Sequence, residues 1–205
     1  MRGLKPPEKV TVCTPCYGGV VDTIYVQGLL QAYGAGLIQN WVVISTESLV
    51  PRARNRMAHQ FLQSDSDRLV FLDADVGWTG KDLEMLLENN LDIVGGAYPK
   101  KSFTKPGWIF GDRLGERGNL LEVKEAGTGF LAIKRKVIAE MSQTVTKIQH
   151  DDVEMAELFP IGVDPDTGRY LSEDWYFCML CREAGFRIWI DRRIRLRHAG
   201  RHVFQ

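Results

Sequence analysis

The chain contains 205 residues, and its 26 Lys and Arg side chains balance 26 Asp and Glu side chains, so its formal net charge is zero. Hydrophobic residues make up 44% of the chain, which predicts a soluble globular protein with one large domain over residues 1–205. A neutral chain argues against nucleic-acid binding through overall positive charge, and the sequence lacks an apolar run of the roughly 18 residues that cross a bilayer.

The first half of the chain alternates strand patterns with helix patterns. Short apolar runs predict strands at residues 10–13, 41–45, 69–72 and 91–94, and helical periodicity predicts helices at 21–37, about 52–63 and about 81–88. This alternation is typical of a parallel sheet with helices on its faces. The C-terminal ends of such strands meet along one edge, where open α/β sheets bind their ligands.

The second half is less regular. We expect short mixed or antiparallel strands at 108–110, 120–123 and 130–133, a polar loop or lid over 149–169, a helix from 172 to about 184 and a strand at 187–190. The predicted fold class is therefore α/β, with a mostly parallel, Rossmann-like central sheet flanked by helices and a small mixed or antiparallel second sheet. Between residues 187 and 205, six arginines stand against one acid, Asp191.

Two aspartates, Asp73 and Asp75, follow the apolar strand at 69–72. In strand-like geometry their carboxylates would share one side, and paired carboxylates suit a hard divalent cation. A cation there could bridge the oxygens of a diphosphate and stabilise its charge as it departs. The alternative is structural, because Asp is common after strands and Asp73 could simply cap the turn that follows.

Further motifs occur around this Asp-Ala-Asp segment. They are Val12-Cys13-Thr14-Pro15-Cys16-Tyr17, Leu49-Val50-Pro51-Arg52-Ala53-Arg54-Asn55, Gly127-Thr128-Gly129-Phe130, Ser172-Glu173-Asp174-Trp175, Arg182-Glu183-Ala184-Gly185-Phe186 and His198-Ala199-Gly200. The series resembles the nucleotide-sugar glycosyltransferases of the GT-A fold, above all the inverting family 2 and its short viral, phage or bacterial members. The resemblance spans about residues 10–200 and implies a nucleotide-binding half at about 8–100 and an acceptor-binding, catalytic half at about 101–205.

The resemblance implies a site for a metal and a nucleotide. Asp75 would ligate Mn²⁺ or Mg²⁺ directly, Asp73 would contact the ribose or the metal through water, and His198 would be a further ligand with His202 as a fallback. We favour manganese, because imidazole tolerates Mn²⁺ better than Mg²⁺. Judged without the resemblance, His198 is a solvated histidine near the end of the chain.

The resemblance also implies a set of donor contacts. Glu47 is a candidate for reading the base, because the segment after the second strand lacks the aspartate that family 2 members often use to read uracil. Arg54 suits phosphate oxygens, although a solvated helix face is its structural alternative. The implied donor-binding residues are Thr14, Pro15, Tyr17, Glu47, Arg54, Asn55, Asp73, Ala74 and Asp75.

Catalysis is assigned by the resemblance to Asp174, with Glu173 holding the acceptor or replacing Asp174 as the base. An inverting transfer needs a group that takes the proton of the acceptor hydroxyl as its oxygen attacks. The structural alternative is equally good, because Ser172 is a good N-cap and both acids suit the positive end of a helix dipole. The sugar and the acceptor are expected near Gly127, Thr128, Gly129, Trp175 and Trp108.

Four cysteines form two C-x-x-C pairs, Cys13 with Cys16 and Cys178 with Cys181. A strand followed by C-x-P-C and a helix also occurs in thioredoxin-like oxidoreductases, so redox chemistry at Cys13 and Cys16 is an alternative function. A four-thiolate zinc site is a further alternative, although the two pairs lie at opposite ends of the chain. Burial as small apolar side chains is the simpler explanation.

Two more alternatives come from other classes of protein. A phosphohydrolase of the haloacid-dehalogenase type would use Asp73 as its nucleophile, although such enzymes carry this motif on their first strand. A sugar-binding module without catalytic activity is the other alternative, and the apparent metal and base residues argue against it.

We therefore favour a metal-dependent glycosyltransferase. It would move a sugar from a nucleoside-diphosphate donor, UDP-linked, to a hydroxyl of a glycan or glycoconjugate, with inversion. We expect a cytoplasmic protein, in the host cell if its source is a virus, that binds no nucleic acid. The Arg-rich end could contact an anionic or membrane surface.

Overall fold

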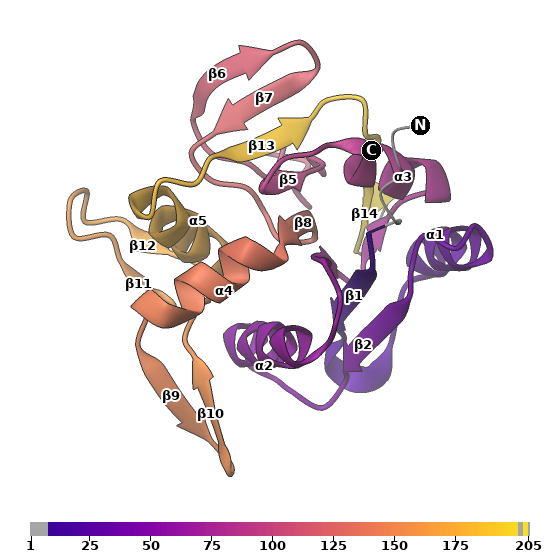
Figure 1. Ribbon diagram of the computed structural model, residues 1–205. Helices are drawn as coiled ribbons and strands as arrows, with labels where there is room; N and C mark the ends of the chain where they lie inside the picture. The colour runs from indigo at the N-terminus through magenta and orange to yellow at the C-terminus, as the bar shows by residue number, and fades with distance from the viewer. Residues whose placement is uncertain (1–7, 201–202, 205) are drawn as a thin grey trace, which may run out of the picture.

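The computed structural model describes residues 8–200 and 203–204. Its centre is an eight-stranded sheet (Figure 1). In order across the sheet, the strands are β2 (Asn40–Ile44), β1 (Val10–Pro15), β3 (Arg68–Leu72), β8 (Phe130–Lys134), β5 (Ile93–Gly95), β13 (Ile188–Asp191), β7 (Leu120–Val123) and β6 (Arg113–Arg117). Strands β8 and β7 run against the others. Strands β2, β1, β3, β5 and β13 therefore end at the same edge of the sheet.

Helices cover both faces of the sheet (Figure 1). One face packs against α2 (Val50–Gln63), α4 (Arg135–Thr144) and α5 (Glu173–Glu183), and the other packs against α1 (Thr23–Gly34) and α3 (Gly80–Glu88). In the described ranges, no helix combines the length and the apolar character needed to span a membrane.

Strand β3 shows why its sequence is a continuous apolar run. Leu69 and Phe71 belong to the hydrophobic cluster on one face of the sheet, and Val70 and Leu72 belong to the cluster on the other. Side chains of a strand alternate between the faces, so a strand covered on both sides needs apolar residues at every position. The predicted α/β fold class is confirmed, and the predicted strands and helices of the first half are found within a few residues.

Two expectations for the second half were wrong, and one helix was missed. Residues 108–110 make only isolated bridges, Pro99 with Trp108 and Phe110 with Ala126, while the neighbouring exposed segment forms β6. The expected loop over 149–169 instead contains the hairpin of β9 (Lys147–His150) and β10 (Val153–Ala156), then β11 (Gly162–Val163), which pairs with β12 (Tyr170–Leu171). These strands are largely exposed, so burial imposes no apolar alternation on them. Helix α4 was not expected.

A three-stranded sheet fixes the late part of the chain beside the acidic motif. It consists of β4 (Val76–Gly77), β14 (Arg197–Ala199) and β15 (Val203–Phe204). His198 lies opposite Val76, and the Ala199 backbone N–H donates to the Asp75 carbonyl over 2.8 Å. This pairing brings His198 next to Asp75. His202, the fallback ligand, lies outside the described residues, as does Arg201.

Candidate functional site

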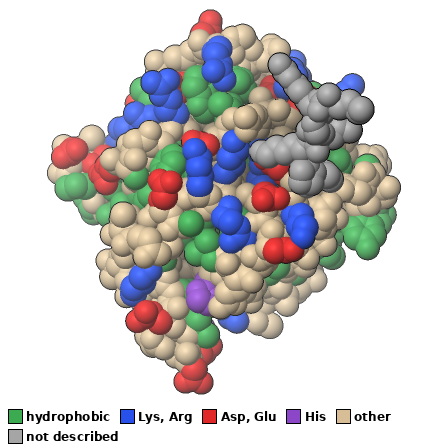
Figure 2. Space-filling view, in the orientation of Figure 1, with side chains coloured by type: hydrophobic (Ala, Val, Ile, Leu, Met, Phe, Trp, Pro, Cys, Tyr) green, Lys and Arg blue, Asp and Glu red, His purple; other side chains and the backbone are tan. Residues whose placement is uncertain are grey.

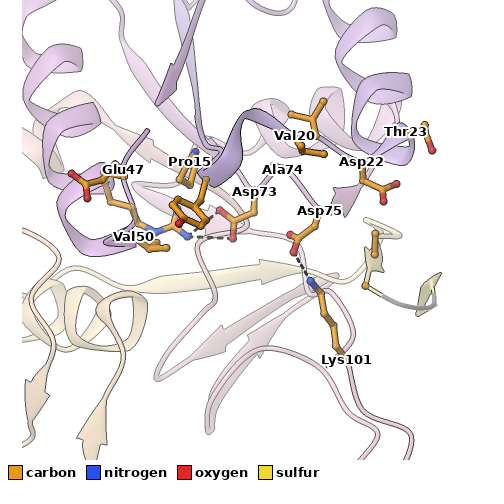
Figure 3. Close-up of a pocket in the computed structure, with 16 residues that line it drawn as sticks. Pro15, Val20, Asp22, Thr23, Glu47, Val50, Asp73, Ala74, Asp75 and Lys101 are labelled. Atoms are coloured by element: carbon orange, nitrogen blue, oxygen red, sulfur yellow. Dashed lines mark hydrogen bonds and ion pairs between the residues drawn. The ribbon is translucent and has the colours of Figure 1, made fainter. Parts of the chain in front are cut away.

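A cavity of about 600 Å³ opens at the edge where β1 and β3 end (Figure 3). Pro15 and Tyr17 line it from the end of β1, and Arg54 lines it from α2. The turn after β3 contributes Asp73-Ala74-Asp75, and the segment before β6 contributes Lys101. The cavity therefore lies where parallel α/β sheets bind ligands.

Asp73 is held by a buried cation. The Arg54 side chain is only 3% exposed, and its Nη2 donates to both Asp73 carboxylate oxygens, over 2.9 and 3.2 Å. Burial raises the pKa of Asp73, while the charge of Arg54 opposes that rise. The same guanidinium donates through Nε to Glu173 over 3.3 Å. Arg54 thus joins the Asp-Ala-Asp turn to the start of α5, and the expectation of a solvated helix face does not hold for it.

Asp75 has different partners. The Lys101 ammonium forms an ion pair with its Oδ2 (Figure 3), and His198 Nε2 lies 3.6 Å from its Oδ1. Burial works against ionisation of this carboxyl, but its contacts with His198 and Lys101 lower its pKa to about 2. The two aspartates therefore do not share one partner.

The His198 ring is oriented by the backbone. Its Nδ1 lies 2.8 Å from the Pro99 carbonyl, which only accepts, so Nδ1 carries the proton and the lone pair of neutral imidazole sits on Nε2. Nε2, which lies 3.6 Å from Asp75 Oδ1, is therefore the ring nitrogen placed to act as a ligand, and an imidazole nitrogen and a carboxylate oxygen are both ligands that a transition-metal ion accepts. Asp75 and His198 therefore fit a shared cation.

A third protein ligand is not in place. Among the residues that the structure describes, no group of three or more His, Cys, Asp and Glu side chains is arranged to hold a metal ion. The Asp73 carboxylate faces Arg54. A direct or water-mediated role for Asp73 toward a metal stays a prediction.

The proposed base lies at the first turn of α5. Asp174 Oδ1 accepts hydrogen bonds from the Ser172 hydroxyl and from the Trp175 backbone N–H, the latter over 2.8 Å. Burial raises the pKa of Asp174. Ser172 occupies the N-cap position, but its side chain makes no capping hydrogen bond. The helix-cap explanation therefore holds only in part. Both acids lie in the first turn of α5, but the Ser172 hydroxyl donates to Asp174 instead of accepting from a backbone N–H of the helix.

The Gly-Thr-Gly segment packs against the acidic turn. The Gly129 carbonyl accepts from the Asp73 backbone N–H over 3.0 Å, and the Gly129 N–H donates to the Tyr98 hydroxyl over 3.1 Å. A Cβ at Gly129 would lie 2.9 Å from Asp73 Oδ2, so only glycine permits this approach. The Thr128 hydroxyl is buried and has no hydrogen-bond partner among the described residues.

The two predicted tryptophans lie in different surroundings. The Arg169 guanidinium lies over the Trp175 ring, 5.0 Å from its centroid, and covers one face of that ring. Trp108 is 46% exposed and lines a second cavity rather than the one around Asp73.

Several residues that were predicted to bind the sugar donor form hydrogen bonds with other residues of the protein instead. The Thr14 hydroxyl is buried between Tyr25 and Trp41, and Asn55 accepts from the Phe159 backbone N–H over 2.9 Å. Glu47 lines the cavity, but Arg52 Nη2 donates to it over 2.7 Å. Pro15, Tyr17 and Ala74 do line the cavity.

The sequence did not single out Lys101, Asp22 or Val20, which also line this cavity. Asp22 has a recognisable signal, because it caps α1 by accepting from Ile24 N–H over 3.0 Å. Lys101 follows Lys100 in an irregular segment where no periodicity distinguishes the two. Its position opposite Asp75 could be found only from the structure.

The cysteines argue against the oxidoreductase. All four are free and buried, and burial raises the pKa of the Cys13 thiol far above its ordinary value. The Cys16 thiol donates to the Val20 carbonyl over 3.1 Å. Because the reactive form of cysteine is the thiolate, this pair is unsuited to redox chemistry.

The sheet order, the covering helices and the small sheet beside the acidic turn define a GT-A-like fold. Two solved structures are similar to this chain. The first is A197 from STIV, with a TM-score of 0.58, 20% identity and coverage of 94% of this chain and 86% of that chain. The second is GalNAc-T7, crystallised with UDP, GalNAc and Mn²⁺, with a TM-score of 0.50, 10% identity and coverage of 95% of this chain and 44% of that chain.

No protein-family model and no curated protein sequence match this chain. At identities of 20% and 10%, the structural likeness establishes the fold alone. This chain spans less than half the length of the GalNAc-T7 structure.

Proposed function

We propose that this protein is a metal-dependent glycosyltransferase that moves a sugar from a nucleoside-diphosphate donor to a hydroxyl of a glycan or glycoconjugate, with inversion. The observation that carries the proposal is that Arg54 forms ion pairs with acids from two different motifs. This one buried guanidinium holds both Asp73 of the acidic turn and Glu173 of the helix that bears Asp174. It therefore sets a donor-side acid and an acceptor-side acid in one fixed arrangement.

The donor side suits a nucleotide diphosphate with a cation. Asp75 and His198 would hold the ion, Mn²⁺ in preference to Mg²⁺, with Asp73 nearby. When bound, the ion supplies positive charge to the departing diphosphate. The GalNAc-T7 structure, which contains UDP and Mn²⁺, supports a UDP-linked donor. We further propose that residues 8–100 carry most of the donor contacts and residues 101–205 the acceptor contacts.

The acceptor side supplies the base. Asp174 Oδ1 is occupied by hydrogen bonds from Ser172 and Trp175, so Oδ2 is the oxygen left to take the proton of the acceptor hydroxyl. Burial raises the pKa of this carboxyl, which makes its ionised form a stronger base. Arg54 pairs with Glu173 beside it and so positions the start of the helix.

A donor-panel assay tests the mechanism. We expect nucleotide release to require Mn²⁺ and to stop with EDTA. Asp75→Asn should lose most activity and weaken Mn²⁺ binding, while Asp174→Asn should lower the rate by about 10²- to 10⁴-fold with nucleotide binding intact. Release that continues unchanged in EDTA and in both variants would contradict the proposal.

A further inference from the structure

A second cavity, of about 290 Å³, opens at the same edge of the sheet. Ala97 lines it just beyond the end of β5, and Ile190 and Asp191 line it at the end of β13. Strand β13 stands three places from β3 in the sheet, which is about 14 Å at the usual strand spacing. The cavity thus lies on the ligand-binding edge, beside the site around Asp73.

The lining of the cavity combines apolar and basic side chains. The apolar part of the lining consists of Ala97, Trp108, Phe110, Leu121, Ile190 and Ile194. Three arginines, Arg113, Arg192 and Arg195, complete the lining. Figure 2 shows Lys and Arg side chains around a group of hydrophobic ones over the β6–β7 hairpin, the part of the molecule that supplies Arg113 and Leu121.

Acidic side chains of the protein itself neutralise only part of the positive charge of these arginines. Asp191, the acid in the lining, is fully buried and is bound by Arg193 and Asn89. Arg195 donates its backbone N–H to Asp82, but within the described part of the chain its guanidinium has no hydrogen-bond or ion-pair partner.

The other two arginines are only partly engaged. Arg113 lies over the Phe110 ring, 6.0 Å from its centroid. Arg192 donates to the Gly118 carbonyl over 2.7 Å and lies 3.7 Å from an exposed acid, Glu116. Arginines at an apolar cavity are complementary to a planar anion such as a carboxylate, which a guanidinium binds through two parallel hydrogen bonds.

We propose that this cavity is an acceptor subsite for a sugar unit that carries a carboxylate. The inference rests on the proposed glycosyltransferase function and specifies its acceptor. The anionic group pairs with Arg195 and Arg113, and the apolar face of the sugar packs on Trp108. A few polar groups placed around an apolar surface are the usual composition of a small-molecule pocket.

The concave shape favours a glycan over a lipid surface. A cavity of about 290 Å³ has room for a small ligand, whereas a membrane is flat. Its position about three strands from the acidic turn suits a neighbouring unit of the acceptor, while the unit that accepts the sugar lies near Asp174.

The test compares a panel of disaccharides ending in glucuronic acid with matched disaccharides ending in glucose, by titration calorimetry in the presence of UDP and Mn²⁺. We expect the acidic members to bind at least tenfold more tightly than their neutral counterparts. Arg195→Gln and Arg113→Gln should each remove most of this preference. Because the preference is electrostatic, it should also shrink at high salt.

Arg187→Gln is the matched control, because Arg187 is an exposed arginine just before the start of β13, away from this edge. It should keep the preference. Trp108→Ala should weaken the binding of acidic and neutral disaccharides equally. Equal or absent binding of the two panels, or a preference that survives both cavity variants, would overturn the subsite. Arginine-dependent binding to anionic vesicles without binding to the acidic sugars would overturn it as well.

The same titrations separate this inference from the function on which it rests. Binding of UDP with Mn²⁺ is measured in each sample before the disaccharide is added. Intact UDP binding without an acid preference would overturn the subsite alone. Failure of UDP and Mn²⁺ to bind would count against the glycosyltransferase, whatever the disaccharides do.

Discussion

Arg54 links two acids of the candidate site, Asp73 and Glu173, through a single buried side chain. Its side chain is 3% exposed, and its charge is balanced by Asp73 and Glu173. It also lies over the Phe71 ring, 5.2 Å from the centroid, so both its charge and its flat face are used. Replacement by a neutral residue would leave two acids without their counterion, a change that costs about 3–5 kcal/mol in buried pairs.

The Lys101 ammonium lies beside the Asp75 carboxylate, where a metal ion would also bind. Its ammonium pairs with the carboxylate, so an incoming metal ion must displace it or share the charge. Both side chains are partly exposed, at 35% and 44%, which limits the energy of the pair. We expect Lys101→Gln to tighten Mn²⁺ binding roughly two- to fivefold, as measured by electron paramagnetic resonance.

Lys105→Gln is the control for Lys101, because Lys105 is an exposed lysine of the same segment. It should leave Mn²⁺ affinity unchanged. Weaker Mn²⁺ binding in Lys101→Gln would show that the lysine assists the cation instead of competing with it.

Glu47 offers a test through pH. Its pKa is about 2 in the folded protein, against an ordinary value of 4.5, chiefly because Arg52 hydrogen-bonds it. Since the folded pKa is the lower one, the stabilisation is present above about pH 4.5 and is lost as the pH falls toward 2. We expect Arg52→Gln to flatten the pH dependence of the free energy of unfolding in this window, measured by urea titration.

Arg56→Gln serves as the comparison for Arg52, since it removes an arginine from the same helix without touching Glu47. The pH dependence should then stay as in the original protein. An unchanged slope in Arg52→Gln would mean that the ion pair does not hold Glu47 in solution.

At the scale of elements, the close approach of α1 to the residue that follows β4 requires glycine at position 28. Gly28 is buried in α1, and a Cβ there would lie 2.4 Å from the Trp78 ring and 2.6 Å from the Trp78 carbonyl oxygen. The carbonyl belongs to the backbone, so the helix itself would have to move. We expect Gly28→Ala to destabilise the protein by about 1–3 kcal/mol, seen as a lower urea midpoint.

Gly34 is the matched position at the end of the same helix. A Cβ there meets nothing within 4 Å, so Gly34→Ala should be neutral or stabilising by up to about 1 kcal/mol. Equal effects of the two substitutions would contradict the packing argument.

At the scale of the whole molecule, burial decides what the sequence reveals. Strands β1, β3 and β5 lie inside the sheet, and their apolar runs predict them. Strands β6, β9 and β10 are mostly exposed, and nothing in packing forces a pattern on their residues. Helix α4 does have a signal in the sequence, because Val137, Ile138 and Met141 are apolar residues at helical spacing, and all three are buried.

The same reasoning applies to the candidate site. Acids in sequence motifs, such as Asp75 and Asp174, can be found because the residue type and its place after a strand or at a helix start are visible. The partners of these acids depend on how distant segments meet. Arg54 meets Glu173 across 119 positions, and Lys101 reaches Asp75 from an irregular segment. Long-range contacts of this kind leave no periodicity in the sequence.

The pairing of β14 with β4 also bears on how the protein reaches its final form. Asp75 and His198 belong to segments that most of the second half of the chain separates. Contacts between such distant segments require a long loop to close first, which slows their formation during folding. We therefore expect the walls that β1, β3 and α2 supply to assemble before Asp75 and His198, the proposed cation ligands, meet. A partly folded chain would then present no ready chelate, which would protect it from capturing metal ions prematurely.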